Sequence, residues 1–134
     1  MDFEVPVPSA TTAEWLAAVP SELTGLVERL RNLIYRVAFD VDAWPLVEEL
    51  KWGQPSYRSP HGNESTPVRL GLTAGDDVAL LTHCQSSVVP EFRAVFGERF
   101  RFEGDRAVLV SDADAGHIDE LADFVGRALT YRRG

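Results

Sequence analysis

The chain has a single cysteine, Cys84, and a single lysine, Lys51. One thiol excludes an intramolecular disulfide and a multi-thiolate zinc site within one chain. No apolar run is long enough to cross a bilayer. Positive charge is also scarce, because 13 basic residues stand against 21 acidic ones and give a net charge of -8. That charge opposes a phosphate backbone, so we expect neither nucleic acid nor a membrane as a partner.

What the chain does contain is the composition of a globular domain, with 45% hydrophobic and 25% charged residues over 134 positions. We expect one domain over residues 1–134, with a loosely ordered lead-in over residues 1–10, where Pro6 and Pro8 interrupt any helical period. The acidic start lacks the basic flank and apolar core of a signal peptide. The sequence therefore predicts a cytoplasmic protein, and we expect a monomer or a homodimer.

Apolar residues recur at helical spacing in several segments. The clearest pattern predicts a helix after Ser21, and another predicts a C-terminal helix that begins at Asp112 or Asp114. The two apolar stripes consist of Leu23, Leu26, Val27, Leu30, Ile34 and Val37, and of Ile118, Leu121, Ala122, Val125 and Leu129. Shorter helices are predicted over residues 11–19, 42–50 and 90–96.

Between residues 57 and 110 the apolar period falls to two, which is typical of strands. Tight turns at residues 73–77 and at Gly104-Asp105 predict hairpins, and hairpin connections make neighbouring strands antiparallel. The sequence therefore predicts an α+β fold, a two-layer sandwich in which helices pack on a mostly antiparallel sheet of about five strands.

The densest combination of unusual residues is Leu-Lys-Trp-Gly-Gln-Pro-Ser-Tyr at residues 50–57. A glycine next to a large aromatic residue and shortly before a proline predicts a turn, here at the exit of the 42–50 helix. Rings at this turn suit stacking on a planar ligand, while amide and ammonium groups suit its polar edge. The predicted ligand-binding residues are Lys51, Trp52, Gln54, Tyr57 and His83, the last at the end of a central strand.

A purely structural role for the same motif is the alternative. In that reading Trp52 packs under the sheet, Gly53 adopts a left-handed turn, Pro55 stiffens the next strand and Tyr57 closes the core. Both roles are compatible with one motif.

This motif, preceded by an acidic pair and followed by hairpin strands, resembles the YdhG-like family, small bacterial proteins of unassigned function (domain of unknown function 1801). The resemblance covers about residues 11–131 and implies a sandwich with an antiparallel sheet. Some members resemble frataxins, which bind and deliver iron through an acidic ridge on a long helix. In this chain the corresponding helix mixes acidic and basic residues, and the loop over residues 61–67 is longer than the family's turn.

The sequence also offers residues for a thiol-imidazole pair and for a histidine metal site. His83 and Cys84 could pair as a thiol and an imidazole, but adjacent strand residues point to opposite faces, so we expect a buried, inert cysteine. His61, His83 and His117 lack the spacing of a metal chelate, and no cofactor is predicted. The sequence favours a non-enzymatic domain that binds a small ligand or a protein partner at the Lys51–Tyr57 motif. The alternatives are a frataxin-like metal-delivery protein and an enzyme that uses His83 and Cys84.

Overall fold

The computed structural model describes residues 4–61 and 65–132. Its elements follow in the order α1 (Ala10–Ala17), α2 (Ser21–Asp40), β1 (Val47–Lys51), β2 (Gln54–Arg58), β3 (Val68–Leu72), β4 (Val78–Leu81), α3 (Val88–Phe96), β5 (Arg101–Glu103), β6 (Ala107–Val110), a 3-10 helix η1 (Asp112–Glu120) and α4 (Leu121–Leu129). Within the described residues, six strands form one antiparallel sheet in the order β1-β2-β3-β4-β6-β5. The predicted α+β fold is confirmed, with six strands where about five were expected.

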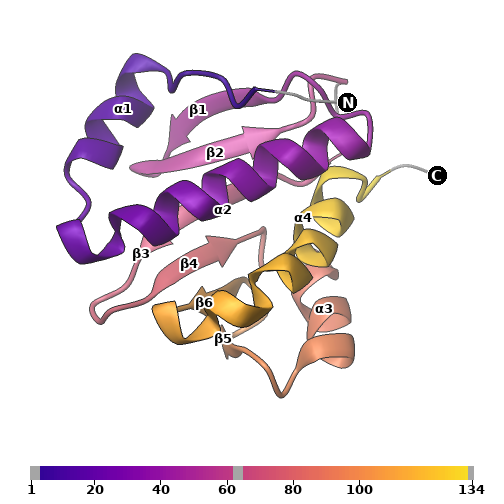
Figure 1. Ribbon diagram of the computed structural model, residues 1–134. Helices are drawn as coiled ribbons and strands as arrows, with labels where there is room; N and C mark the ends of the chain where they lie inside the picture. The colour runs from indigo at the N-terminus through magenta and orange to yellow at the C-terminus, as the bar shows by residue number, and fades with distance from the viewer. Residues whose placement is uncertain (1–3, 62–64, 133–134) are drawn as a thin grey trace.

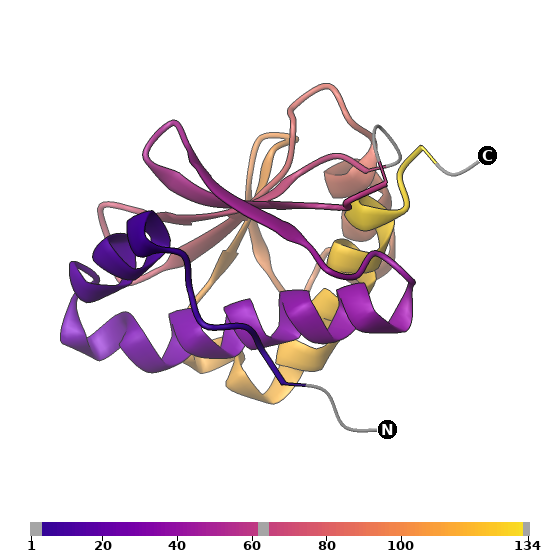
Figure 2. The same cartoon turned by 90° about the horizontal axis from the view of Figure 1, so that it is seen from above.

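Helices α2 and α4 pack on one face of the sheet. Figure 1 views the molecule from this side, and Figure 2 shows both helices beneath the strands. The two apolar stripes meet here, because Leu30 of α2 and Val125 of α4 are both fully buried. This confirms that one apolar surface holds the two helices against the sheet.

The α3 helix joins this layer through an aromatic cluster. Phe92 is fully buried, and its ring lies 5.7 Å from that of Phe124 in α4, edge to face. It also lies 5.7 Å from Phe100 and 6.3 Å from Phe102 of β5. Edge-to-face rings add to the stabilisation from burial, so this cluster fixes α3 relative to both α4 and the far edge of the sheet.

The helix predicted over residues 42–50 is wrong, because residues 47–51 form strand β1. Leu46, Val47 and Leu50 fit a helical count, yet the two-residue turn after Lys51 closes a hairpin in which β1 pairs with β2 along its whole length. Cross-strand pairing over five residues outweighs so short a helical pattern. The motif therefore lies at the tip of a hairpin instead of at a helix exit.

Two other boundaries differ from expectation. The turn between β5 and β6 has three residues, because Glu103 pairs with Ala107. The predicted C-terminal helix starts as η1, where the Asp114 carboxylate accepts the Ser111 amide at 2.8 Å, and becomes α-helical only at Leu121.

The start of the chain is more closely attached than the predicted lead-in. Val5 packs against the core, and the Ser9 amide donates to Glu48 Oε1 at 2.9 Å. Residues 1–3 of that lead-in, and residues 62–64 of the loop predicted over residues 61–67, lie outside the described residues. No described helix is both long and apolar enough to cross a membrane.

Side chains alternate between the two faces of the sheet, and those opposite α2 and α4 form what we name the open face. The open face includes Glu49, Lys51, Gln54, Ser56, Arg69, Gly71, Ala79, Leu81 and Ala107. Its centre is built from small residues, and Ala79, Leu81 and Ala107 are buried there beside Leu109. Long polar side chains surround this shallow apolar centre.

Candidate functional site

The hairpin tip at Trp52-Gly53 has an unusual backbone. Both residues have positive φ, 55° at Trp52 and 74° at Gly53, as a two-residue hairpin turn of this type requires. Glycine adopts this conformation freely, whereas a bulky residue in it is strained. Trp52 is nevertheless 89% exposed, so burial does not offset that strain.

We expect Gly53→Ala to lower the free energy of unfolding by about 1–2 kcal/mol, because the new side chain would be held in the left-handed region. A Cβ at Gly53 meets nothing within 4 Å, so the loss would be conformational and not steric. Gly25→Ala is the matched control. Gly25 lies inside α2, where an added Cβ also meets nothing, and alanine there should stabilise by about 0.5–1 kcal/mol. Urea denaturation of both variants checks the pair, and a neutral Gly53→Ala would contradict the strain argument.

A cavity of about 170 Å³ lies beside the hairpin, on the open face. Three segments of the chain contribute to its wall: the β1–β2 hairpin, the start of β3, and the loop that follows β4. The lining residues are Lys51, Trp52, Ser56, Pro67, Arg69 and His83. We name this space the hairpin cavity.

Gln54 lies beside Gly71 and against Arg69, a residue of the cavity wall. A Cβ on Gly71 would come within 2.7 Å of Gln54 Nε2, so a side chain at this position would displace that amide. The amide oxygen of Gln54 accepts Arg69 Nη1 at 3.2 Å. Pro55 has no amide hydrogen to donate, and the β2–β3 ladder includes only Ser56 and Tyr57 of β2.

Two lining groups carry unused binding capacity. Ser56 is 1% exposed, and its Oγ has no hydrogen-bond partner among the described residues. Burying a hydroxyl without a partner costs free energy. Arg69, directly opposite Ser56 in the sheet, takes part in no ion pair within the described part of the chain.

The electrostatic environment of Arg69 follows from its neighbours. Burial lowers the pKa of its guanidinium, and the positive charge of Arg106 lowers that pKa further. Arg106 itself pairs with Glu103, and Lys51 Nζ lies 3.6 Å from a Glu49 oxygen. Arg69 is therefore the cation of the cavity wall whose charge no described carboxylate neutralises.

A larger cavity of about 440 Å³ adjoins the first, because Pro67 and His83 line both. Its other lining residues are Ser65, Thr66, Gln85, Ser86, Tyr131 and Arg132. His83 is exposed, and its Nδ1 accepts the Gln85 amide at 3.1 Å, which orients the ring within the loop after β4.

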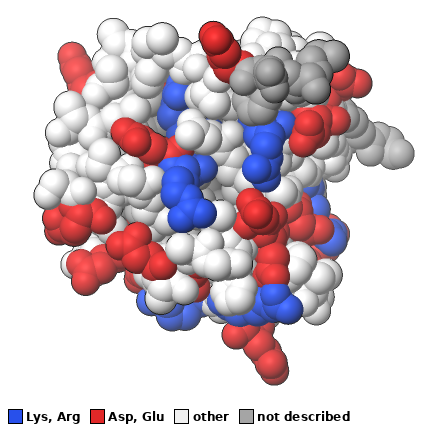
Figure 3. All heavy atoms as spheres, in the orientation of Figure 1, with Lys and Arg blue, Asp and Glu red and all other residues white. Residues whose placement is uncertain are grey.

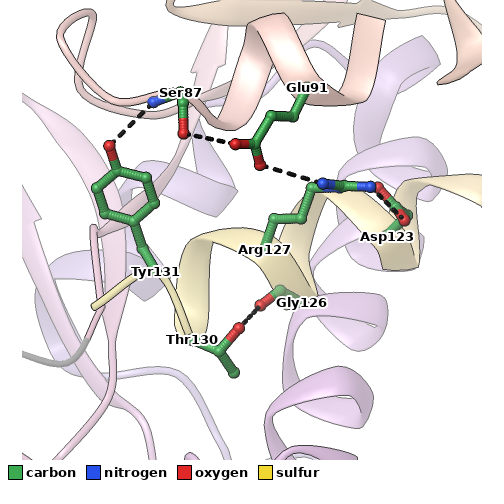
Figure 4. Close-up of polar contacts among 7 residues, drawn as sticks. All are labelled: Ser87, Glu91, Asp123, Gly126, Arg127, Thr130 and Tyr131. Atoms are coloured by element: carbon green, nitrogen blue, oxygen red, sulfur yellow. Dashed lines mark hydrogen bonds and ion pairs between the residues drawn. The ribbon is translucent and has the colours of Figure 1, made fainter. Parts of the chain in front are cut away.

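A polar network shown in Figure 4 holds the far wall of the larger cavity. The Tyr131 hydroxyl accepts the Ser87 amide at 3.1 Å, just before α3. Ser87 Oγ donates to Glu91, which also accepts Arg127 Nη1 at 3.1 Å. Arg127 in turn bonds Asp123 one helical turn earlier. These contacts join the start of α3 to the end of α4, so the wall belongs to a well-supported part of the fold.

The structure brings together three of the five predicted ligand-binding residues, Lys51, Trp52 and His83, in the lining of the hairpin cavity. Gln54 is not in the lining, although its amide oxygen accepts a hydrogen bond from Nη1 of Arg69, which is in the lining. Tyr57 does not belong to it, because it faces the core and is fully buried, 5.6 Å ring to ring from Tyr35. The structural alternative was correct for Gly53, which has a left-handed backbone, and for Tyr57, which is buried. It was wrong for Trp52, which is exposed and does not pack under the sheet.

Sequence reasoning missed Ser56, Pro67 and Arg69. The signal was present, because Gln54 and Ser56 share a face once β2 is known to start at Gln54. Cys84 was expected to be buried and is exposed. The reason is that β4 already ends at Leu81, so the chain has left the sheet before it reaches Cys84.

The described residues on the helix side do not form an acidic ridge. Figure 3 shows acidic and basic side chains interspersed over the side from which Figure 1 is viewed. Along α2 the exposed Glu28 is followed directly by Arg29, and Arg36 lies 3.7 Å from Asp119. Within residues 4–61 and 65–132, no group of three or more histidine, cysteine, aspartate or glutamate side chains is arranged to hold a metal ion.

Comparison with protein-family models finds no match, and neither the curated proteins nor the solved structures give one.

Proposed function

We propose that this protein binds a small ligand, without transforming it, in the hairpin cavity. The cavity is concave, combines one aromatic ring with several polar groups, and continues into a larger space beside it. Ligand sites in proteins have this combination of a shaped wall and few polar groups. The same proposal places the protein in the cytoplasm and treats the chain as a distant relative of the YdhG-like proteins.

One observation carries the proposal: Trp52 is both strained and exposed. A left-handed conformation costs a bulky residue about 1–2 kcal/mol, and an 89% exposed indole regains little of this by burial. Strained residues that persist without a packing reason are typical of functional sites. The indole therefore has a use outside the folded monomer, and the cavity beside it is where that use lies.

A small ligand fits this surface better than a protein partner does. A stable protein interface buries about 800 Å² on each side around a cluster of large apolar anchors. The large hydrophobic residues exposed in the described part of the chain are Val7, Leu50, Trp52, Leu72 and Val95. Of these, Trp52 alone lines the hairpin cavity, and one ring beside a hollow suits stacking on a planar molecule.

We expect Trp52→Asn to raise the free energy of unfolding by about 0.5–1 kcal/mol and to abolish ligand binding. Asparagine tolerates the left-handed region and, followed by glycine, is favoured in this turn. Urea denaturation measures the first effect. A screen of a metabolite mixture by ligand-observed NMR, with parent and variant side by side, measures the second.

Val95→Asn is the control, because Val95 is also exposed but lies in α3, outside both cavities. It should retain the parent's ligands. If Trp52→Asn destabilises the protein, or binds the same metabolites as the parent, the indole is not a binding group. A protein captured by the parent, together with a silent metabolite screen, would favour the protein-partner alternative.

A further inference from the structure

Resting on the proposed ligand-binding function, we infer that the ligand is a small aromatic carboxylate, with its carboxylate on Arg69 and Ser56 and its ring against Trp52. Cavity shape alone does not define the class of ligand. The class follows from which polar groups of the wall already have hydrogen-bond or ion-pair partners in the protein and which do not.

Arg69 supplies the charge. Among the described residues its guanidinium bonds one neutral partner, the Gln54 amide oxygen at 3.2 Å, and the charge that shifts its pKa is the positive charge of Arg106. A half-buried cation beside a like charge gains most from an anion placed against it. A guanidinium has five donors, and a carboxylate accepts two of them side by side, so this group suits a carboxylate better than a neutral ligand.

Ser56 supplies a second donor at the same place. It is the cross-strand neighbour of Arg69 on the open face, and its buried hydroxyl is unpartnered among the described residues. Side chains directly opposite in an antiparallel pair lie about 5 Å apart at Cβ, so Arg69 and Ser56 present their donors to the same part of the open face. The unpartnered hydroxyl lowers the stability of the ligand-free protein, and a bound oxyanion would restore that stability by accepting its hydrogen bond.

The ring is assigned to Trp52 because it is the aromatic group of the cavity wall and is held at the rim by its turn. Lys51 also lines the wall, but its Nζ lies 3.6 Å from a Glu49 oxygen, so Arg69 supplies the positive charge that an anion would meet. A protein with a net charge of -8 repels anions at long range. Binding must therefore come from these short-range contacts, so the affinity should depend mainly on Arg69 and Ser56, the residues proposed to hold the carboxylate.

The test uses the whole protein and two probes of equal shape, benzoate and its neutral amide, benzamide, titrated by two-dimensional amide NMR. Benzoate should shift the amide signals of Gly53, Ser56 and Arg69 and bind at least about tenfold more tightly than benzamide. Inorganic phosphate, which has charge but no ring, should bind about tenfold more weakly than benzoate.

Variants separate the contributions. Arg69→Gln should weaken benzoate binding about tenfold or more and leave benzamide unchanged, and Ser56→Ala should weaken benzoate several-fold. Arg58→Gln is the control, because Arg58 is on the same face of β2 but outside the cavity lining, and it should bind benzoate as the parent does. Since Ser56→Ala removes an unpartnered hydroxyl, its thermal midpoint should not fall, which keeps the test independent of folding.

Equal binding of benzoate and benzamide at these amides would overturn the carboxylate inference and leave the ligand site in place. Equal binding of phosphate and benzoate would overturn the assignment of the ring to Trp52. If neither aromatic probe shifts these signals, the inference fails. If the metabolite screen is also silent, the proposed function fails with it.

Discussion

Replacing Glu48 with glutamine should lower the free energy of unfolding by about 3–5 kcal/mol, the cost typical of leaving one member of a buried ion pair unpaired. Glu48 Oε2 accepts Arg31 Nε at 3.0 Å, and both side chains are 7% exposed. Arg31 already has one buried nitrogen, Nη2, without a partner among the described residues. With the carboxylate gone, the guanidinium would stay buried with no opposing charge.

Glu49→Gln is the matched control, one position further along β1. The Glu49 carboxylate is partly exposed and lies 3.6 Å from both Lys51 and Arg58. Such pairs contribute about 0–1 kcal/mol, so this variant should stay within about 1 kcal/mol of the parent. Urea denaturation of the two variants separates a buried pair from an exposed one. Equal losses would mean that the Arg31–Glu48 pair is as well solvated as its neighbours.

Alkaline pH should destabilise the protein through two buried tyrosines. Burial, with the nearby Glu48 carboxylate as a second cause, raises the pKa of Tyr35 from 10.0 to about 12 and also raises the pKa of Tyr57. Below about pH 10 both phenols are neutral in the folded and the unfolded chain, and their contribution to stability is fully present. Above it the unfolded chain ionises first, so stability falls. For Tyr35 the loss approaches about 3 kcal/mol, and it is complete only above about pH 12.

Urea denaturation at about pH 9 and about pH 11 measures the first part of this loss. Tyr57→Phe should match the parent's stability within about 1 kcal/mol at the lower pH, because the buried hydroxyl has no hydrogen-bond partner of normal geometry among the described residues. It should also recover part of the loss at the higher pH. A loss as large as the parent's would show that the Tyr57 phenol does not contribute.

Long periodic patterns predicted most of the fold. The stripes that contain Leu30 and Val125 extend over many turns, and each turn repeats the same evidence for a buried face. Residues 42–50 show the limit of this method. Three apolar residues over two turns fit a helix, and the deciding contacts, those with β2, lie further along the chain. The secondary structure of a short segment is therefore set by the element with which it pairs and not by its own apolar pattern.

The candidate site was predicted less completely for a related reason. Lys51 and Trp52 were found because their residue types are unusual, and neither distinguishes a hairpin tip from a helix exit. Ser56 and Arg69 are ordinary residue types, and they matter because an antiparallel pairing places them opposite one another. Tyr57 was misplaced because its face depends on the residue at which β2 begins. Residue type locates a motif, whereas register decides which of its members share a surface.

The β1–β2 hairpin carries core and cavity residues on alternate positions, and this has a consequence for how the gene can change. Glu48 and Tyr57 face the core, while Lys51 and Ser56 face the cavity. Inserting or deleting one codon within either strand would turn the residues on one side of the change to the opposite face, so core and cavity residues there would trade places. In homologous chains the number of residues in the segment 47–58 should therefore stay the same, while the identities of individual residues can change. A gap of odd length within either strand would identify homologues that fold or bind differently.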